Sequence, residues 1–146
     1  MDAFEAGRMP PGGFPHPAHV RMAWIYLRRY PLETAIARFS SALRRFAAAQ
    51  GEPGRYHETI TAAYVVLIHD RLARTTAADW NTFAANHPDL LVWKPSVLDA
   101  HYSPDILWSD RARDTFLPPD RMPLPGPRTE SGPEGPPLRP PCRGRR

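Results

Sequence analysis

Residues 62–68 read Ala-Ala-Tyr-Val-Val-Leu-Ile, and this stretch decides the fold that we expect. It is apolar on every side of a helical wheel, which is typical of a helix that other elements cover on most sides. Pro53 suits the start of that helix, and Arg74 lies near its expected end. The sequence therefore predicts a central helix around which the rest of the chain packs.

Apolar side chains at helical spacing predict two helices before the central one. The first covers residues 18–30, and Pro31 suits the first position of the second. In the second helix, apolar residues recur at alternating steps of four and three, which indicates an amphipathic helix. These residues are Leu32, Ile36, Phe39, Leu43 and Phe46.

Two shorter helices are expected after the central one. A sequence that resembles a capping box, residues 76–79, predicts a helix through Phe83. Ser103-Pro104-Asp105 predicts a last helix that ends near Phe116, and residues 90–93 form a short linker that could be extended. Because no hairpin signal competes, the expected fold class is all-α, a single small bundle of four to five helices.

Both ends of the chain differ in composition from the middle. Residues 1–13 are rich in Gly and Pro, so we expect a flexible N-terminus. Ten of the 19 prolines fall in residues 118–146, where too little apolar surface is present to offset the entropy of ordering. The sequence thus predicts a helical domain over residues 14–120 and a disordered Pro/Arg-rich tail over residues 121–146.

Charge and cysteine content exclude several classes of protein. The formal net charge is +4, of which +3 lies in residues 118–146, and a body near +1 argues against strong nucleic-acid binding. The single cysteine, Cys142, excludes a disulfide framework and a cysteine-built zinc site. Neither a membrane-spanning run nor a signal-peptide pattern is present, so the cytoplasm is the expected location and no membrane association is predicted.

Two polar segments near predicted helix starts carry the candidate functional residues. Residues 14–19 read Phe-Pro-His-Pro-Ala-His, and residues 56–61 read Tyr-His-Glu-Thr-Ile-Thr. Non-haem iron and catalytic zinc accept imidazoles plus one carboxylate while leaving positions open. The sequence therefore offers His16, His19 and His57 as ligands of a divalent metal, Fe or Zn, with Glu58 beside them.

The same residues suit acid–base chemistry without a metal. His57, Thr61 and Tyr64 share one stripe of a helical wheel, and histidine titrates near neutral pH. Together with Glu58 they form the candidate catalytic set, with a small molecule as the candidate substrate. A structural interpretation is also open, in which histidine and glutamate simply occupy a solvated first turn near the positive end of the helix dipole.

The expected chain path would bring these segments together. Pro31 and residues 51–54 break the chain twice, so an up-down-up bundle returns the third helix parallel to the first. Both helix starts would then lie at the same end. We expect the His19 and His57 side chains to approach closely, with His16 beside them and Glu58 at the rim.

The segments Phe14-x-His16-x-x-His19 and Tyr56-His57-x-Thr59-x-Thr61 resemble those of small helical bacterial proteins. The similarity spans residues 14 to about 120 and implies that these residues form the site, but it implies no particular activity. Two functions follow from the sequence as hypotheses. The leading one is a metal-dependent or His-assisted enzyme with a His-lined pocket that acts on a small molecule. The alternative is a non-catalytic accessory protein that docks a partner through its bundle surface or its basic tail. A small nucleic-acid-binding module is a third and weaker alternative.

Overall fold

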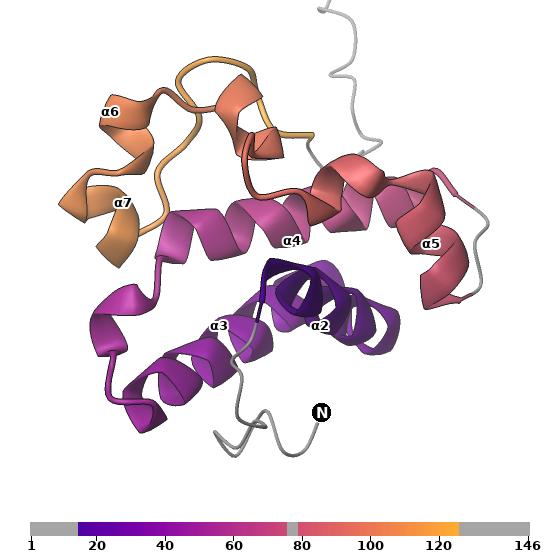
Figure 1. The fold of residues 1–146 in the computed structure, drawn as a ribbon, viewed down its shortest axis with the longest axis horizontal. Helices are drawn as coiled ribbons and strands as arrows, with labels where there is room; N and C mark the ends of the chain where they lie inside the picture. The colour runs from indigo at the N-terminus through magenta and orange to yellow at the C-terminus, as the bar shows by residue number, and fades with distance from the viewer. Residues whose placement is uncertain (1–14, 76–78, 126–146) are drawn as a thin grey trace, which may run out of the picture.

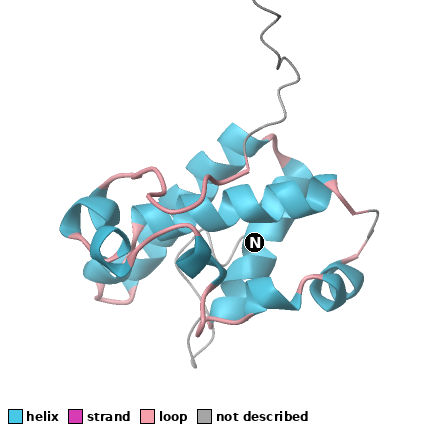
Figure 2. Ribbon diagram, turned by 90° about the horizontal axis from the view of Figure 1, so that it is seen from above, coloured by secondary structure: helices cyan, strands magenta, loops and turns pink. Residues whose placement is uncertain are grey.

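The computed structural model describes residues 15–75 and 79–125. The prediction of an all-α fold is confirmed, because the described residues form helices, turns and loops but no strand (Figure 2). The helices of the bundle's first half are α2 (His16–Arg29), α3 (Leu32–Ala49) and α4 (Glu58–Ala73). A set of shorter elements follows. They are α5 (Trp80–Asn86), the 3-10 helices η2 (Pro88–Leu91) and η3 (Val97–Ala100), α6 (Pro104–Leu107) and α7 (Asp110–Asp114).

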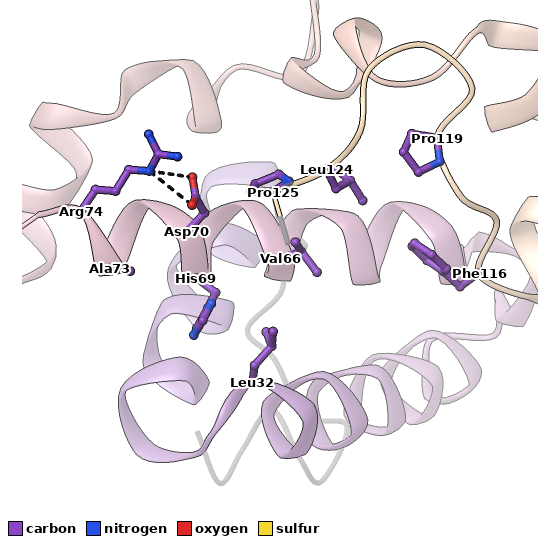
Figure 3. A pocket seen from close by; sticks show the side chains of 10 residues that line it. All are labelled: Leu32, Val66, His69, Asp70, Ala73, Arg74, Phe116, Pro119, Leu124 and Pro125. Atoms are coloured by element: carbon purple, nitrogen blue, oxygen red, sulfur yellow. Dashed lines mark hydrogen bonds and ion pairs between the residues drawn. The ribbon is translucent and has the colours of Figure 1, made fainter. Parts of the chain in front are cut away.

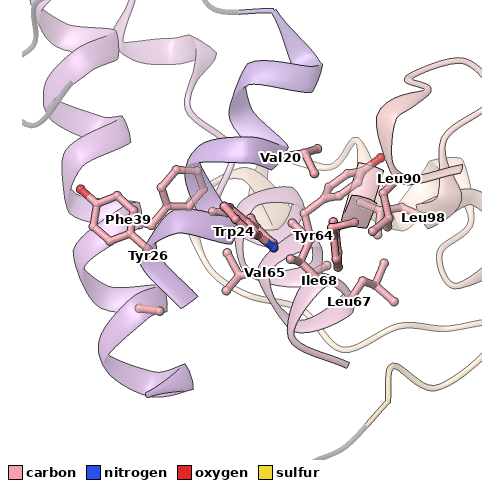
Figure 4. Close-up of a cluster of buried hydrophobic side chains, with 14 of the residues drawn as sticks. Val20, Trp24, Tyr26, Phe39, Tyr64, Val65, Leu67, Ile68, Leu90 and Leu98 are labelled. Carbon is pink, nitrogen blue, oxygen red and sulfur yellow. The ribbon is translucent and has the colours of Figure 1, made fainter. Parts of the chain in front are cut away.

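Helix α4 is the central helix that the apolar stretch predicts. It lies between α2 and α3 on one side and α6 and α7 on the other (Figure 1), and it packs against α2, α3 and α7. Its middle residues are buried, as expected for a helix without a polar face. Figure 4 shows Tyr64, Val65 and Ile68 of α4 among Trp24 of α2 and other core side chains.

The N-terminal boundaries of the helices differ slightly from prediction, because two prolines act as caps. Pro15 and Pro31 have extended backbone and precede the first residues of α2 and α3. The carbonyl of Pro15 accepts the first helical hydrogen bonds, so α2 begins at His16, two residues earlier than predicted. Pro31 lies just outside α3 instead of in its first turn.

The predicted third helix does not start at Pro53. A single 3-10 turn, η1 (Pro53–Arg55), is followed by a break at Tyr56 and His57, and α4 begins only at Glu58. His57 has extended backbone and is the N-cap of α4, so it lies before the first turn. The imidazole satisfies a free amide at the helix start, which a serine or aspartate usually does.

The predicted last helix is divided into two. Its start is correct, because Ser103 caps α6 with its hydroxyl. Ser109 then caps a second helix in the same way, so α6 ends at Leu107 and α7 begins at Asp110. A polar side chain that bonds the backbone ahead of it competes with helix continuation, which explains the division.

The short elements before α6 also depart from prediction. Residues 88–91 form the 3-10 helix η2 instead of an extended linker. Asp79 caps α5 by accepting a hydrogen bond from the Thr82 amide, so α5 begins at Trp80. The remainder of the predicted capping box, residues 76–78, lies outside the described residues.

The described chain ends in a strap, residues 115–125, that crosses back over α4. The Tyr102 hydroxyl donates to the Leu117 carbonyl, and the Asp120 carboxylate accepts from the Ser103 amide. Leu124, four residues past the predicted domain boundary at residue 120, packs against the core. The predicted flexible N-terminus and residues 126–146 of the predicted tail lie outside the described residues.

Candidate functional site

His57 joins two parts of the fold through both of its ring nitrogens. Its Nδ1 accepts a hydrogen bond from the Ile60 amide at 3.1 Å, and its Nε2 donates to the Leu107 carbonyl at 2.7 Å. The side chain is only 7% exposed. Burial lowers the pKa of His57, and the bond to Leu107 opposes that shift only in part. The imidazole is therefore held neutral, with a fixed tautomer.

His16 lies at the start of α2 and contacts α4 at Tyr64, about two helical turns after His57. Its Nε2 donates to the Leu90 carbonyl at 2.9 Å, and its ring packs edge-on against Tyr64 with a centroid distance of 4.9 Å. The Tyr64 hydroxyl in turn forms a hydrogen bond with the Ser96 hydroxyl at 2.9 Å. Burial lowers the pKa of His16 and raises that of Tyr64.

Two tryptophans connect these histidines at the surface. Trp93 lies 5.2 Å from His16, Trp108 lies 5.7 Å from His57, and the two indoles meet edge to face at 6.5 Å, all between ring centroids. Trp93 is 37% exposed and Trp108 is 52% exposed. We call these two indoles, with His16 and His57 beneath them, the aromatic surface.

The structure does not bring the predicted metal ligands together. His16 contacts Tyr64, which lies seven residues after His57, and seven residues span roughly 10 Å of helix axis. Among the described residues, no three His, Cys, Asp or Glu side chains form a group that could hold a metal ion. The two helix starts do share one side of the bundle, but they are offset along α4, so the indoles fill the space between the imidazoles.

His19 is half-buried on α2, one turn after His16. Burial lowers its pKa to about 4, and the nearby charges of His16 and Arg55 contribute to the same shift. The first two histidines of the predicted set are therefore neighbours. At neutral pH the His19 ring is uncharged.

Glu58 and Thr61 are the other predicted catalytic residues. The Glu58 carboxylate accepts hydrogen bonds from the Tyr56 hydroxyl and from Arg44 of α3, the latter at 2.8 Å. The Arg44 guanidinium also lies over the Tyr56 ring, and burial raises the pKa of Tyr56 to about 12. Thr61 is buried. Glu58 thus belongs to a cluster that ties α3 to the start of α4, separate from the indoles.

A hollow on the outer face of α4 was not expected from the sequence. It measures about 360 Å³ and lies between the start of α3 and the strap (Figure 3). Its walls are mostly apolar, and Asp70 and Arg74 form an ion pair at 3.1 Å beside it. The lining residues are Leu32, Val66, His69, Asp70, Ala73, Arg74, Phe116, Pro119, Leu124 and Pro125. His69, which the pattern suggests is a core or helix-end residue, is one of them.

The exposed positions of Trp93 and Trp108 were not predicted from the sequence. Spacing indicates only that they are aromatic residues in irregular segments, which is typical of core or lid positions. One signal was available, because polar residues Lys94-Pro95-Ser96 and Ser109-Asp110 directly follow the two indoles. Large aromatic residues next to polar turns often remain partly exposed.

Comparisons with known proteins give no match. No protein-family model, no curated protein sequence and no solved structure resembles this chain closely enough to be significant. Within residues 15–75 and 79–125, none of the helices has the length and apolar character needed to cross a membrane.

Proposed function

We propose that this chain is a non-catalytic binding protein that docks a protein partner on its aromatic surface. The observation that carries the proposal is the pair of exposed, touching indoles, Trp93 and Trp108. Tryptophan is among the residues most enriched at binding hot spots, because it buries a large area at little cost in conformational entropy. The proposal includes a bacterial origin and a cytoplasmic location, and it excludes specific nucleic-acid binding.

The residues beneath the indoles support a binding role. The His16 and His57 rings pack against Trp93 and Trp108, and each donates a hydrogen bond to a backbone carbonyl. Indoles held in this way have few accessible rotamers. A surface that is ordered before binding loses less entropy on association, which favours affinity.

The same contacts argue for binding over catalysis. A general base needs a ring nitrogen within reach of a substrate proton. Both nitrogens of His57 are engaged by the backbone, and the Glu58 carboxylate is engaged by Tyr56 and Arg44. Metal-dependent or His-assisted chemistry by these residues would first require those hydrogen bonds to break.

The proposal can be tested by affinity capture with the full chain as bait. The double variant Trp93→Ala/Trp108→Ala should lose partners that the unmodified chain retains. Phe116→Ala is the control, because it also removes an exposed aromatic side chain, at 41% exposure, but from the strap.

Two results would contradict the proposal. One is a set of captured partners that the double variant retains while its circular dichroism spectrum and melting temperature show a folded chain. The other is a turnover activity of the purified chain that His57→Gln abolishes without unfolding it. The second result would restore the enzyme hypothesis.

A second candidate function is the binding of a small apolar molecule in the hollow on α4. Its volume falls within the range of small-molecule sites, and its walls are mostly apolar, as such sites usually are. An apolar dye such as anilinonaphthalene sulfonate should bind the folded chain, and Ala73→Trp should weaken that binding by filling the hollow. Ala48→Trp, at an exposed position of α3, is the control. Equal dye binding by both variants would exclude the hollow as the place where the dye binds.

A further inference from the structure

We infer that the aromatic surface binds a proline-rich basic segment, and that residues 136–141 of this chain are such a segment. They read Pro-Pro-Leu-Arg-Pro-Pro. This inference rests on the proposed function, because it names the chemistry of the ligand that the surface takes. It also implies that the chain's own C-terminal segment competes with external partners for Trp93 and Trp108.

Exposed indoles match proline rings as binding partners. Proline-rich segments in the polyproline II form dock on surfaces lined by aromatic side chains, and they lose little entropy because the form is largely preset. That helix has three residues per turn, so Pro137 and Pro140 would fall on one face. Trp93 and Trp108, with ring planes at 85°, offer two differently oriented faces against which proline rings can pack.

The formal charges of the two regions are opposite. The portion of the chain that carries both indoles, residues 89–120, has six aspartates against Lys94, Arg111 and Arg113, a formal charge of −3. Residues 126–146 have five arginines and two glutamates, a formal charge of +3. By contrast, residues 16–74 have nine arginines against four acidic residues. The basic segment is therefore complementary to the acidic half of the fold, which bears the indoles, and not to the basic half.

Acidic residues adjoin the two indoles in the sequence or through a shared neighbour. Asp105 and Asp110 are exposed and flank Trp108 in the sequence. Asp99 lies close enough to Tyr64, which packs against Trp93, to raise the pKa of that phenol. Arg139 and Arg143 would meet carboxylates on either side of the aromatic surface.

The chain between the strap and the proline-rich segment is long enough to span the distance to the indoles. Pro125, the last described residue, lines the hollow beside the C-terminal half of α4, whereas Trp108 packs on the N-cap of α4. The 16 residues of α4 span roughly 24 Å. Pro136 follows Pro125 by eleven residue steps, and at about 3.1 Å per residue an extended chain covers roughly 34 Å over them. The segment is long enough to reach the indoles of its own chain.

The only cysteine, Cys142, makes a direct test with the full chain simple. A nitroxide attached to it lies one residue past Pro141 and broadens nearby NMR signals. We expect the indole N–H signals of Trp93 and Trp108 to lose intensity relative to the reduced label. The Trp80 signal should not, because Trp80 packs on Trp24 at a different part of the fold. Single Trp→Phe variants assign the four indole signals.

Matched variants separate the proline segment from the rest of the tail. Pro136→Ala, Pro137→Ala, Pro140→Ala and Pro141→Ala together should restore the Trp93 and Trp108 signals. Pro127→Ala with Pro133→Ala removes prolines from the same tail but should leave the broadening intact. Arg139→Gln with Arg143→Gln should weaken it, more at low salt than at high salt.

Equal intensities for all four indoles, or broadening that survives the fourfold proline variant, would overturn the inference. Broadening that appears in a mixture of isotope-labelled and spin-labelled chains would place the segment on a neighbouring copy and overturn the same-chain assignment. The capture experiment stays independent of these outcomes. If Trp93→Ala/Trp108→Ala loses its partners but no selective broadening occurs, the proposed function stands and only this inference fails.

Discussion

The two halves of the described chain are held together in different ways. Residues 16–73 form three helices of 14 to 18 residues whose stability comes mainly from buried apolar side chains. Residues 80–125 form short helical turns, most of which begin at a Ser or Asp side chain that bonds the backbone ahead. The first half supplies most of the core, to which the second half adds Phe83, Leu90, Leu98, Tyr102 and Leu107. The second half also supplies the exposed indoles. Burial of apolar side chains thus stabilises the first half, whereas the second half depends in addition on specific hydrogen bonds between side chains and the backbone.

The largest effect on stability is expected in the first half. Ile68→Ala removes a fully buried side chain from the centre of α4 and should lower the free energy of unfolding by about 2–5 kcal/mol. Trp108→Ala removes a larger side chain from the second half but should cost much less, because half of that indole already faces solvent. Urea denaturation of both variants measures the difference, and equal losses would contradict the comparison.

The next largest effect concerns the junction between the halves. His57→Ala removes the N-cap of α4 and leaves the Leu107 carbonyl without its donor, which should cost about 1–3 kcal/mol. His57→Asn is the variant to compare with it. Asparagine is a good N-cap, but its side chain is too short to reach the Leu107 carbonyl.

The two His57 variants together separate capping from bridging. Thermal and urea unfolding should rank the Asn variant between the Ala variant and the unmodified chain. If both variants are equally destabilised, the N-cap hydrogen bond contributes nothing, and the loss of stability comes entirely from the hydrogen bond to Leu107. If neither is destabilised, the interpretation of His57 as a structural junction is wrong.

The sequence predicted the first half well and the second half poorly, for a physical reason. Leu32, Ile36 and Phe39 repeat with the helical period, and burial of such a stripe is nearly independent of the rest of the chain. Ser109, by contrast, could have remained inside one long helix. Whether it caps a new helix depends on tertiary contacts such as the bond from His57 to Leu107, which no local pattern specifies.

The candidate site followed the same division. The sequence predicted that His19 and His57 approach each other with His16 beside them, whereas the ring contact that His16 makes with α4 is to Tyr64. The offset between the starts of α2 and α4 was not predictable, because it depends on how α2 packs along α4. The indoles of Trp93 and Trp108 entered the site only through irregular segments, whose path no periodicity describes.

A pH dependence of stability should come from the neutral histidines around the aromatic surface. The pKa of His19 in the folded chain is about 4, against 6.5 for an unperturbed histidine. The unfolded chain therefore binds the proton first, so the stability present at pH 7 is lost as the pH falls from about 6.5 toward 4. One pH unit below 6.5 the loss from His19 should be about 1 kcal/mol, reduced by solvent screening because the ring is not fully buried.

Melting temperatures at pH 7 and pH 5.5 test this expectation. His16 and His57, whose pKa values are also lowered by burial, contribute in the same direction. His19→Gln removes the titrating group and should reduce the fall in melting temperature. A fall as steep in the Gln variant as in the unmodified chain would assign the pH dependence to the other histidines.

The smallest effect is expected at the second junction between the halves, the ion pair of Arg71 on α4 with Asp89 on η2. The pair is bidentate, with N–O distances of 3.0 and 2.7 Å, and it lowers the pKa of Asp89. However, the Asp89 side chain is 51% exposed, so water already solvates much of the carboxylate, and holding two side chains in one geometry costs entropy.

Asp89→Asn should therefore cost only about 0.5 kcal/mol of stability, and this loss should shrink at high salt because exposed charges are screened. Urea denaturation at two NaCl concentrations measures both quantities. A loss as large as that of His57→Ala, unchanged by salt, would mean that an exposed ion pair holds the two halves as firmly as the buried imidazole does, and the distinction between the two junctions would no longer hold.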